Sequence, residues 1–248
     1  MLKLKGIIAP LPTPFNHEGD LYTAKVRHNV AKWNRVALGG YLVASELGEG
    51  PMLDAEEKLQ LWSLVRESAA EGRTLIADVS MPSVRASAAL AKAAAEHGYH
   101  AVHATGPARG DAELYFRSLA DRSPLPLLAP GSFEHPNIVA APEERIDDLS
   151  GHLQRKQNWG VWMLAAAAPY VAVTIQEAVQ KREYEAAEDW QARANKVIQL
   201  VNDRHGIPGL KHALDFNGYY GGPCRLPYPV LPRAAQVEIE EALHGLRS

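Results

Sequence analysis

Short apolar runs alternate with amphipathic stretches along the first half of the chain. The apolar runs cover residues 6–9, 41–43, 74–77 and 99–104, and the amphipathic stretches cover 22–36, 54–65, 85–97 and 111–120. Within the first stretch, Tyr22, Val26, Val30 and Trp33 recur at three- or four-residue steps, the spacing of one helix face. Four strand-then-helix units in a row predict a parallel sheet.

The second half of the chain is less regular. Residues 125–128 and 138–140 have the apolar pattern of buried strands, but only about ten residues separate them. A parallel crossover usually takes at least about 10–12 residues including a helix, so we expect a distortion here. Residues 143–157 have a helical pattern, 161–164 read as a seventh strand, and about 170–204 have helical composition. The pattern offers no convincing eighth strand.

Composition and charge narrow the class of protein. Hydrophobic residues make up 46% of the 248 residues and charged residues 22%, the balance of a globular protein with a sizeable core. A net charge of -3 with mixed signs predicts neither nucleic acid nor an anionic membrane surface as partner. Pro169 and Thr174 interrupt the most apolar window, 160–175, so we expect no membrane span. Cys224 is the only cysteine, which fits a reducing cytoplasm.

Several segments resemble one enzyme family. Thr13-Pro14-Phe15 follows the first apolar run, and YLVASELGEGPMLDAEEK, with Gly48 and Glu49, echoes a Gly-Thr-Thr-Gly-Glu loop before a helix. HPNIVA (135–140) is similar to the family's sixth strand, and IPGLKHALDFNGYYGGPCRLP (207–227) to the C-terminal segment of its 4-hydroxy-2-oxoglutarate aldolase branch. The chain thus resembles the dihydrodipicolinate synthase and N-acetylneuraminate lyase family of pyruvate-dependent aldolases.

The resemblance implies a fold and an assembly. We expect an α/β protein with a TIM (β/α)8-type barrel, shortened and distorted around strands 5–8 and followed by C-terminal helices. One domain should span 1–248, with the barrel over about 1–170 and the helical part over 171–248. A homo-oligomer, dimer or tetramer, and a small-molecule oxo acid as ligand follow from the same resemblance.

The resemblance also implies a chemistry whose residues are missing here. Family members form a Schiff base between pyruvate and a lysine that follows the sixth strand, and this position aligns with Pro142. The family's proton-relay tyrosine aligns with Ala129, and its substrate-binding threonine pair aligns with Glu46-Leu47. A fourth element, a tyrosine from the neighbouring subunit, has no counterpart in GPARG (106–110).

Other lysines are poor replacements on sequence grounds. Lys156 precedes the seventh strand and so belongs to the wrong face of a barrel. Lys211 is expected in a C-terminal helix that packs outside the barrel. Lys92, Lys181 and Lys196 fall on helices and are most simply solvated surface residues.

Polar residues at predicted strand ends define a candidate site. Glu46, Asp78 and His103 follow the second, third and fourth strands, where active sites of this fold lie, and are candidate catalytic residues. Ser45 and Glu49 are candidate substrate-binding residues. With Glu49, the three could also hold a divalent ion, or they could simply hydrogen-bond loop backbones. We expect no metal and no cofactor. His97, His100 and His103 cannot all converge on a metal, because two of them alternate across a strand.

Three hypotheses for function stay open. The first is a catalytically degenerate family member, a pseudoenzyme with a binding or regulatory role. The second is a lyase or other enzyme of altered mechanism that acts on a small oxo acid with Glu46, Asp78 and His103. The third is an aldolase rescued by a lysine from elsewhere. Fold analogy alone does not choose among them.

Overall fold

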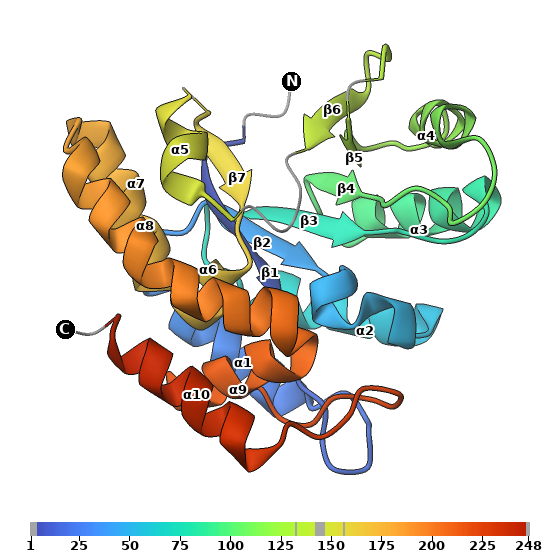
Figure 1. Cartoon of the computed structure of the whole chain (residues 1–248). Helices are drawn as coiled ribbons and strands as arrows, with labels where there is room; N and C mark the ends of the chain where they lie inside the picture. The colour runs from blue at the N-terminus through green and yellow to red at the C-terminus, as the bar shows by residue number, and fades with distance from the viewer. Residues whose placement is uncertain (1–3, 132, 142–146, 156, 247–248) are drawn as a thin grey trace.

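The computed structural model describes residues 4–131, 133–141, 147–155 and 157–246. Seven parallel strands form one sheet in the order β6-β5-β4-β3-β2-β1-β7. The strands are β1 (Gly6–Leu11), β2 (Gly40–Val43), β3 (Thr74–Asp78), β4 (Ala101–His103), β5 (Leu127–Pro130), β6 (Ile138–Ala141) and β7 (Trp159–Val161). They curl into a nearly closed barrel surrounded by helices, which confirms the TIM-barrel prediction (Figure 1).

The strand order shows where the barrel is incomplete. β7, the last strand, pairs in parallel with β1, so it takes the place of the strand that closes a complete barrel. β6 lies at the opposite edge of the sheet and does not pair with β7. Within the described residues there is no eighth strand, and the position left open is the one between β6 and β7. The predicted shortening of the barrel is therefore confirmed, and the gap lies between β6 and β7.

The helices follow the strands in the first half and dominate the end of the chain. They are α1 (Thr23–Trp33), α2 (Ala55–Ser68), α3 (Val84–Glu96), α4 (Ala112–Ala120), α5 (Leu149–Gln154), α6 (Leu164–Ala167), α7 (Pro169–Lys181), α8 (Tyr184–Ile198), α9 (Gly206–Phe216) and α10 (Arg233–His244). Short turns η1 (Glu46–Gly48) and η2 (Gly50–Met52) precede α2, and a π-helical turn, η3 (Gln199–Arg204), follows α8.

Two predicted boundaries in the second half were wrong. Among the described residues, the helix predicted over 143–157 covers only Leu149–Gln154; the Asp148 side chain accepts a hydrogen bond from the Gly151 amide and caps it. Residues 143–146 and 156 of that prediction lie outside the described residues. The seventh strand ends at Val161 and not at Leu164, because the chain turns there into the buried helix α6.

The connection between β5 and β6 is short, as predicted. The two strands pair in parallel, yet only residues 131–137 join them, and no helix is assigned among the described ones, 131 and 133–137. A return along a four-residue strand covers about 13 Å, and seven extended residues span up to about 25 Å, so the connection is long enough without a helix. The short crossover therefore leaves the parallel pairing of β5 and β6 intact.

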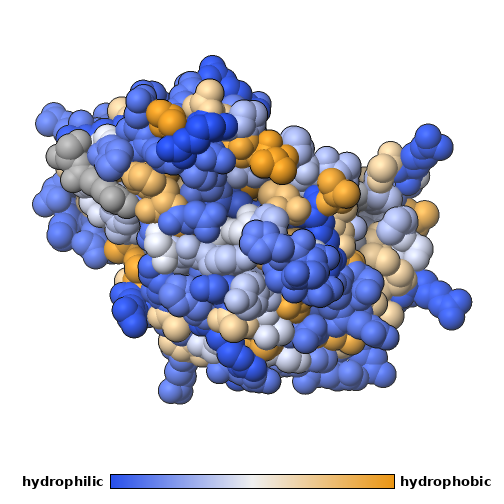
Figure 2. Space-filling view, turned by 90° about the horizontal axis from the view of Figure 1, so that it is seen from below, coloured by the Kyte–Doolittle hydropathy of each residue, from blue (hydrophilic) through white to orange (hydrophobic). Residues whose placement is uncertain are grey.

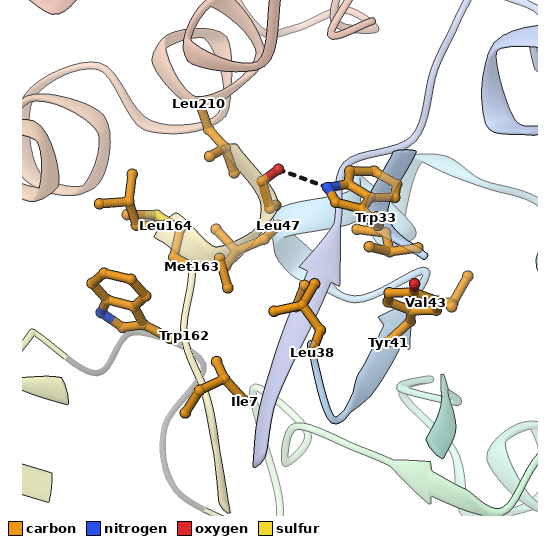
Figure 3. Close-up of a cluster of buried hydrophobic side chains, with 14 of the residues drawn as sticks. Ile7, Trp33, Leu38, Tyr41, Val43, Leu47, Trp162, Met163, Leu164 and Leu210 are labelled. Atoms are coloured by element: carbon orange, nitrogen blue, oxygen red, sulfur yellow. Dashed lines mark hydrogen bonds between the residues drawn. The ribbon is translucent and has the colours of Figure 1, made fainter. Parts of the chain in front are cut away.

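Apolar side chains fill both sides of the strands. A small inner cluster comprises Leu4, Ile8, Leu42, Ile76, Ala101, Leu128 and Val161. A larger cluster lies between the strands and the helices and includes Trp33, whose indole nitrogen donates to the Ala166 carbonyl at 2.8 Å (Figure 3). Loss of one such aromatic side chain typically costs about 3–5 kcal/mol.

The surface and the helices give no sign of a membrane span. No helix in the described part of the chain has the length and hydropathy needed to cross a bilayer. On the face seen from below, hydrophilic residues predominate and hydrophobic residues lie in small separate groups (Figure 2).

Candidate functional site

Asp78 and His103 form a buried pair at the ends of two neighbouring strands. The two residues lie directly opposite each other in the β3–β4 register. The His103 Nδ1 lies 2.6 Å from Asp78 Oδ2, and both side chains are about 95% buried. The second oxygen, Asp78 Oδ1, accepts a hydrogen bond from the Ser80 amide at 2.9 Å. Because the carboxylate accepts at Nδ1, the nitrogen of His103 that can take up a proton is Nε2.

Strand periodicity directs this pair into the barrel. Ile76 and Ala101 belong to the inner cluster, and Asp78 and His103 each stand two residues further along the same strands. Residues two apart in a strand share a face, so the pair points inward at the C-terminal ends. The structure therefore brings two of the three predicted catalytic residues together at the end of the barrel where this fold places its active sites.

The third predicted catalytic residue, Glu46, has a different environment. It begins η1 in the loop after β2, and its side chain is exposed. It therefore does not share the buried setting of Asp78 and His103. Its role in catalysis stays a prediction.

Ser45, the residue before Glu46, is fully buried. Its hydroxyl oxygen has no hydrogen-bond partner among the described residues, although Ser45 occupies the N-cap position of η1. The loop is sharply bent, since Ala44 and Glu49 both have positive φ. An unsatisfied buried hydroxyl in such a loop is compatible with the predicted substrate contact, which stays a prediction.

Glu49 belongs to a buried ion pair. Its Oε1 lies 2.5 Å from the Lys211 Nζ, and its Oε2 accepts from the Arg225 amide at 2.8 Å. The Lys211 ammonium also donates to the Pro223 carbonyl and lies over the Phe15 ring. Both oxygens of Glu49 are thus occupied by the chain's own groups, which favours a structural role over substrate binding.

Lys211 lies in the C-terminal helix α9, outside the strands of the barrel, as predicted, but its side chain is buried. Its side chain is 2% exposed, because the stripe Ile207, Leu210, Lys211 and Leu214 forms the buried face of α9. The ion pair ties α9 to the loop after β2, so this ammonium is committed to Glu49 and is unsuited to imine formation.

Arg225 adds a second link between the C-terminal segment and the strand-end loops. Its guanidinium makes a bidentate contact with the Glu57 carboxylate and lies over the Phe15 ring. The hydrogen bond from Arg225 lowers the pKa of Glu57, with burial opposing it to a lesser degree. Glu57 also completes the predicted capping box with Asp54 at the start of α2. The C-terminal segment therefore braces both the loop after β2 and the helix that follows it.

Lys58 is a buried lysine that sequence reasoning missed. It is 3% exposed and lies on the buried face of α2 with Leu61, Trp62 and Val65. Burial lowers the pKa of Lys58, and the nearby Asp78 carboxylate opposes this shift. The sequence did contain a signal, because a lysine at an apolar position of an amphipathic helix is exceptional. Lys211 shows the same pattern in α9.

Cys224 provides a first testable property of this region. It is half-buried beside the Glu49–Lys211 pair and lines a surface hollow of about 470 Å³. Burial raises the pKa of the Cys224 thiol to about 12. We expect its alkylation by iodoacetamide near pH 8 to be at least about a hundredfold slower in the folded protein than in guanidinium chloride, because thiolate is scarce. Similar rates in the two states would contradict this.

The remaining predicted positions divide into described and undescribed ones. Ala129 lies in β5, fully buried, and brings no hydroxyl. Pro142 and Lys156 lie outside the described residues. His97 contacts the Ala93 carbonyl and His100 the Leu75 amide, so neither joins His103. No cluster of three metal-ligating side chains occurs among the described residues.

Comparison with known proteins identifies relatives of this chain in sequence and in structure. The N-acetylneuraminate lyase of Rhizobium meliloti (strain 1021) is 27% identical over 284 aligned positions, covering 98% of this chain and 95% of that protein. The 4-hydroxy-tetrahydrodipicolinate synthase of an Exiguobacterium species is 25% identical, covering 96% of each chain. The crystal structure of a dihydrodipicolinate synthase from Bacillus anthracis superimposes with a TM-score of 0.88 at 20% identity, covering 98% of this chain and 99% of that one.

The lengths agree with the open position in the barrel. An alignment over 284 positions is longer than this chain of 248 residues, so the relative has segments with no counterpart here. The model of the dihydrodipicolinate synthetase family matches residues 3–126, half of the chain. The resemblance inferred from the sequence is thereby confirmed, and the chain belongs to the dihydrodipicolinate synthetase family.

Proposed function

We propose that this protein acts on a small 2-oxo acid at the mouth of its barrel by acid–base catalysis, and that it is inactive as an imine-forming pyruvate aldolase. The observation that carries the proposal is the buried Asp78–His103 hydrogen bond at the strand ends. Its relatives are named as a lyase and a synthase, which supports a small-molecule reaction. Pro142, at the aligned lysine position, cannot supply a primary amine.

The Asp78–His103 pair has the arrangement of an oriented general base. The carboxylate holds the Nδ1–H of His103, and Nε2 then removes a proton from the carbon next to the substrate carbonyl. The imidazolium that forms is stabilised by the buried Asp78 carboxylate, whose other oxygen is held by the Ser80 amide. The two loops that carry these residues are tied together, since the Thr105 amide donates to the Ser80 hydroxyl at 2.9 Å. The product of this step is an enol or enolate.

Proton exchange tests the proposal. We expect the protein to exchange the C3 hydrogens of pyruvate or 2-oxobutanoate for deuterium in D2O, followed by proton NMR. His103→Gln and Asp78→Asn should slow the exchange by about 10²–10⁴-fold, the range typical of a positioned general base. His28→Gln, at an exposed histidine, is the matched control and should leave the rate unchanged. Equal rates in wild type and His103→Gln would eliminate His103 as the base.

A trapping experiment tests the absence of imine chemistry. We expect no covalent adduct by intact mass after incubation with pyruvate or 4-hydroxy-2-oxoglutarate and sodium borohydride. An adduct would restore the aldolase hypothesis, and peptide mapping would name the lysine. Binding of a 2-oxo acid without exchange and without adduct would identify a pseudoenzyme with a binding role.

We further propose that the protein is cytoplasmic and self-associates as a dimer or tetramer. The resemblance to the family supports the oligomer, and the single cysteine supports the reducing compartment. Light scattering coupled to size-exclusion chromatography measures the mass in solution, and a monomer at micromolar concentration would remove the oligomer from the proposal.

A further inference from the structure

Lys58 is a buried lysine whose ammonium has no direct partner in the described part of the chain. Its side chain is 97% buried, yet its ammonium makes no hydrogen bond and no ion pair with any described residue. Asp78 is the nearby carboxylate that acts on it, but Asp78 already binds His103 and the Ser80 amide. The Lys58 Nζ is not one of the fully enclosed side-chain atoms that lack a partner, so the stem is buried while the charged end keeps contact with solvent. An anion that replaces this solvent would therefore meet a cation that is already positioned.

The fold places this ammonium beside the Asp78–His103 pair. The loop after β2 leads directly into α2, so the first turn of α2, which contains Lys58, stands near the strand ends. The stripe Lys58, Leu61, Trp62 and Val65 faces the barrel, and Lys58 is its member nearest to the strand ends. A long, flexible lysine side chain at that point can reach a ligand held beside Asp78.

We propose that Lys58 binds the carboxylate of the 2-oxo acid and so selects anionic substrates. This inference rests on the proposed function of the Asp78–His103 pair and specifies the class of substrate. A carboxylate beside Lys58 supplies the missing anion and leaves the carbonyl end of the ligand toward His103. The single negative charge of a carboxylate matches a single ammonium, whereas a phosphate dianion would add repulsion from Asp78 and from the exposed Glu46.

Paired neutral and anionic ligands test the role of Lys58. Dissociation constants for pyruvate and for its neutral analogue pyruvamide would be measured by calorimetry with wild type, Lys58→Met and Lys58→Arg. We expect wild type to prefer pyruvate, and Lys58→Met to lose at least about tenfold in affinity for pyruvate and much less for pyruvamide. Lys58→Arg should restore part of the preference. Lys92→Met, at an exposed lysine, is the matched control and should behave as wild type.

Folding of the variant is monitored in the same experiment. Replacing an unpaired buried cation with an apolar side chain of similar length is expected to leave the melting temperature unchanged or to raise it. A variant that is more stable but binds pyruvate more weakly is the signature of a ligand-binding charge. Circular dichroism melting curves of the four proteins provide this readout.

The possible results separate this inference from the proposed function. If wild type exchanges the C3 hydrogens of pyruvate but binds pyruvate and pyruvamide equally, the proposed function stands and the role of Lys58 is wrong. A pyruvate preference that survives in Lys58→Met would also overturn it, because the carboxylate would then be held elsewhere. A borohydride adduct mapped to Lys58 would show a nucleophile in place of an ion-pairing residue. If wild type neither binds nor exchanges either compound, both proposals fail together.

Discussion

Glu49→Gln is expected to lower the free energy of unfolding by about 3–5 kcal/mol, the typical cost of removing one partner from a buried ion pair. The variant puts a neutral amide beside the buried Lys211 ammonium, which keeps its contacts with the Pro223 carbonyl and the Phe15 ring and its electrostatic interaction with Asp215. For a chain of this size, each kcal/mol shifts the melting temperature by roughly 2–4 °C. Chemical denaturation followed by circular dichroism measures the change.

Two controls show whether the loss comes from the uncompensated charge. Lys211→Met in the Glu49→Gln background removes the remaining charge, so the double variant should be more stable than Glu49→Gln alone. Arg27→Ala breaks the exposed pair with Glu67, whose side chains are 51% and 58% exposed, and should cost less than about 1 kcal/mol. A loss in Glu49→Gln as small as that in Arg27→Ala would mean that the buried pair does not brace the C-terminal segment.

Gly50→Ala is the second change with a large expected effect. A Cβ at position 50 would lie 1.7 Å from the Ala44 carbonyl oxygen and 2.9 Å from the Ser45 oxygen, both of them backbone atoms that cannot swing away. The loop after β2 must therefore open, and we expect a loss of at least about 3 kcal/mol or no folded protein. Where folded protein is recovered, C3 exchange of pyruvate should fall with it.

Gly106→Ala is the matched control for this prediction. Its Cβ would meet nothing closer than the Phe116 ring at 3.5 Å, and its backbone does not require positive φ. An alanine there should be neutral or slightly stabilising, by less than about 1 kcal/mol. Equal stability of the two variants would show that the close approach at Gly50 is relieved by small backbone shifts.

The open position in the barrel links the length of the chain to its chemistry. The last strand closes on β1, so the missing unit is the one between β6 and β7. Pro142, the aligned position of the family lysine, comes next in the sequence after β6, the strand at the edge of this gap, and is itself outside the described residues. The Asp78–His103 pair lies away from the gap, on the central strands β3 and β4, each of which pairs with a neighbouring strand on both sides. The missing strand pairing at the gap therefore does not affect the strands that carry the proposed site.

The sequence by itself determined the alternation of elements, their caps and the family. Apolar runs and helical stripes located the first four units, and the Asp54–Glu57 capping box is present as expected. These features were predictable because they depend on residues a few positions apart. The weak points were 143–157 and 161–164, where helical and strand patterns overlap and tertiary packing sets the boundary.

The tertiary structure decided which side chains meet. Strand register places Asp78 opposite His103, 25 positions further on, and the docking of α9 brings Lys211 to Glu49 across 162 positions. A sequence pattern gives the face on which a residue lies but not the element that covers that face. Lys58 and Lys211 therefore lie on similar stripes, and only the fold gives Lys211 a direct ion pair with Glu49 and leaves Lys58 without a direct partner among the described residues. Burial makes that difference in partners energetically decisive, because an unpaired charge is costly only where water is excluded.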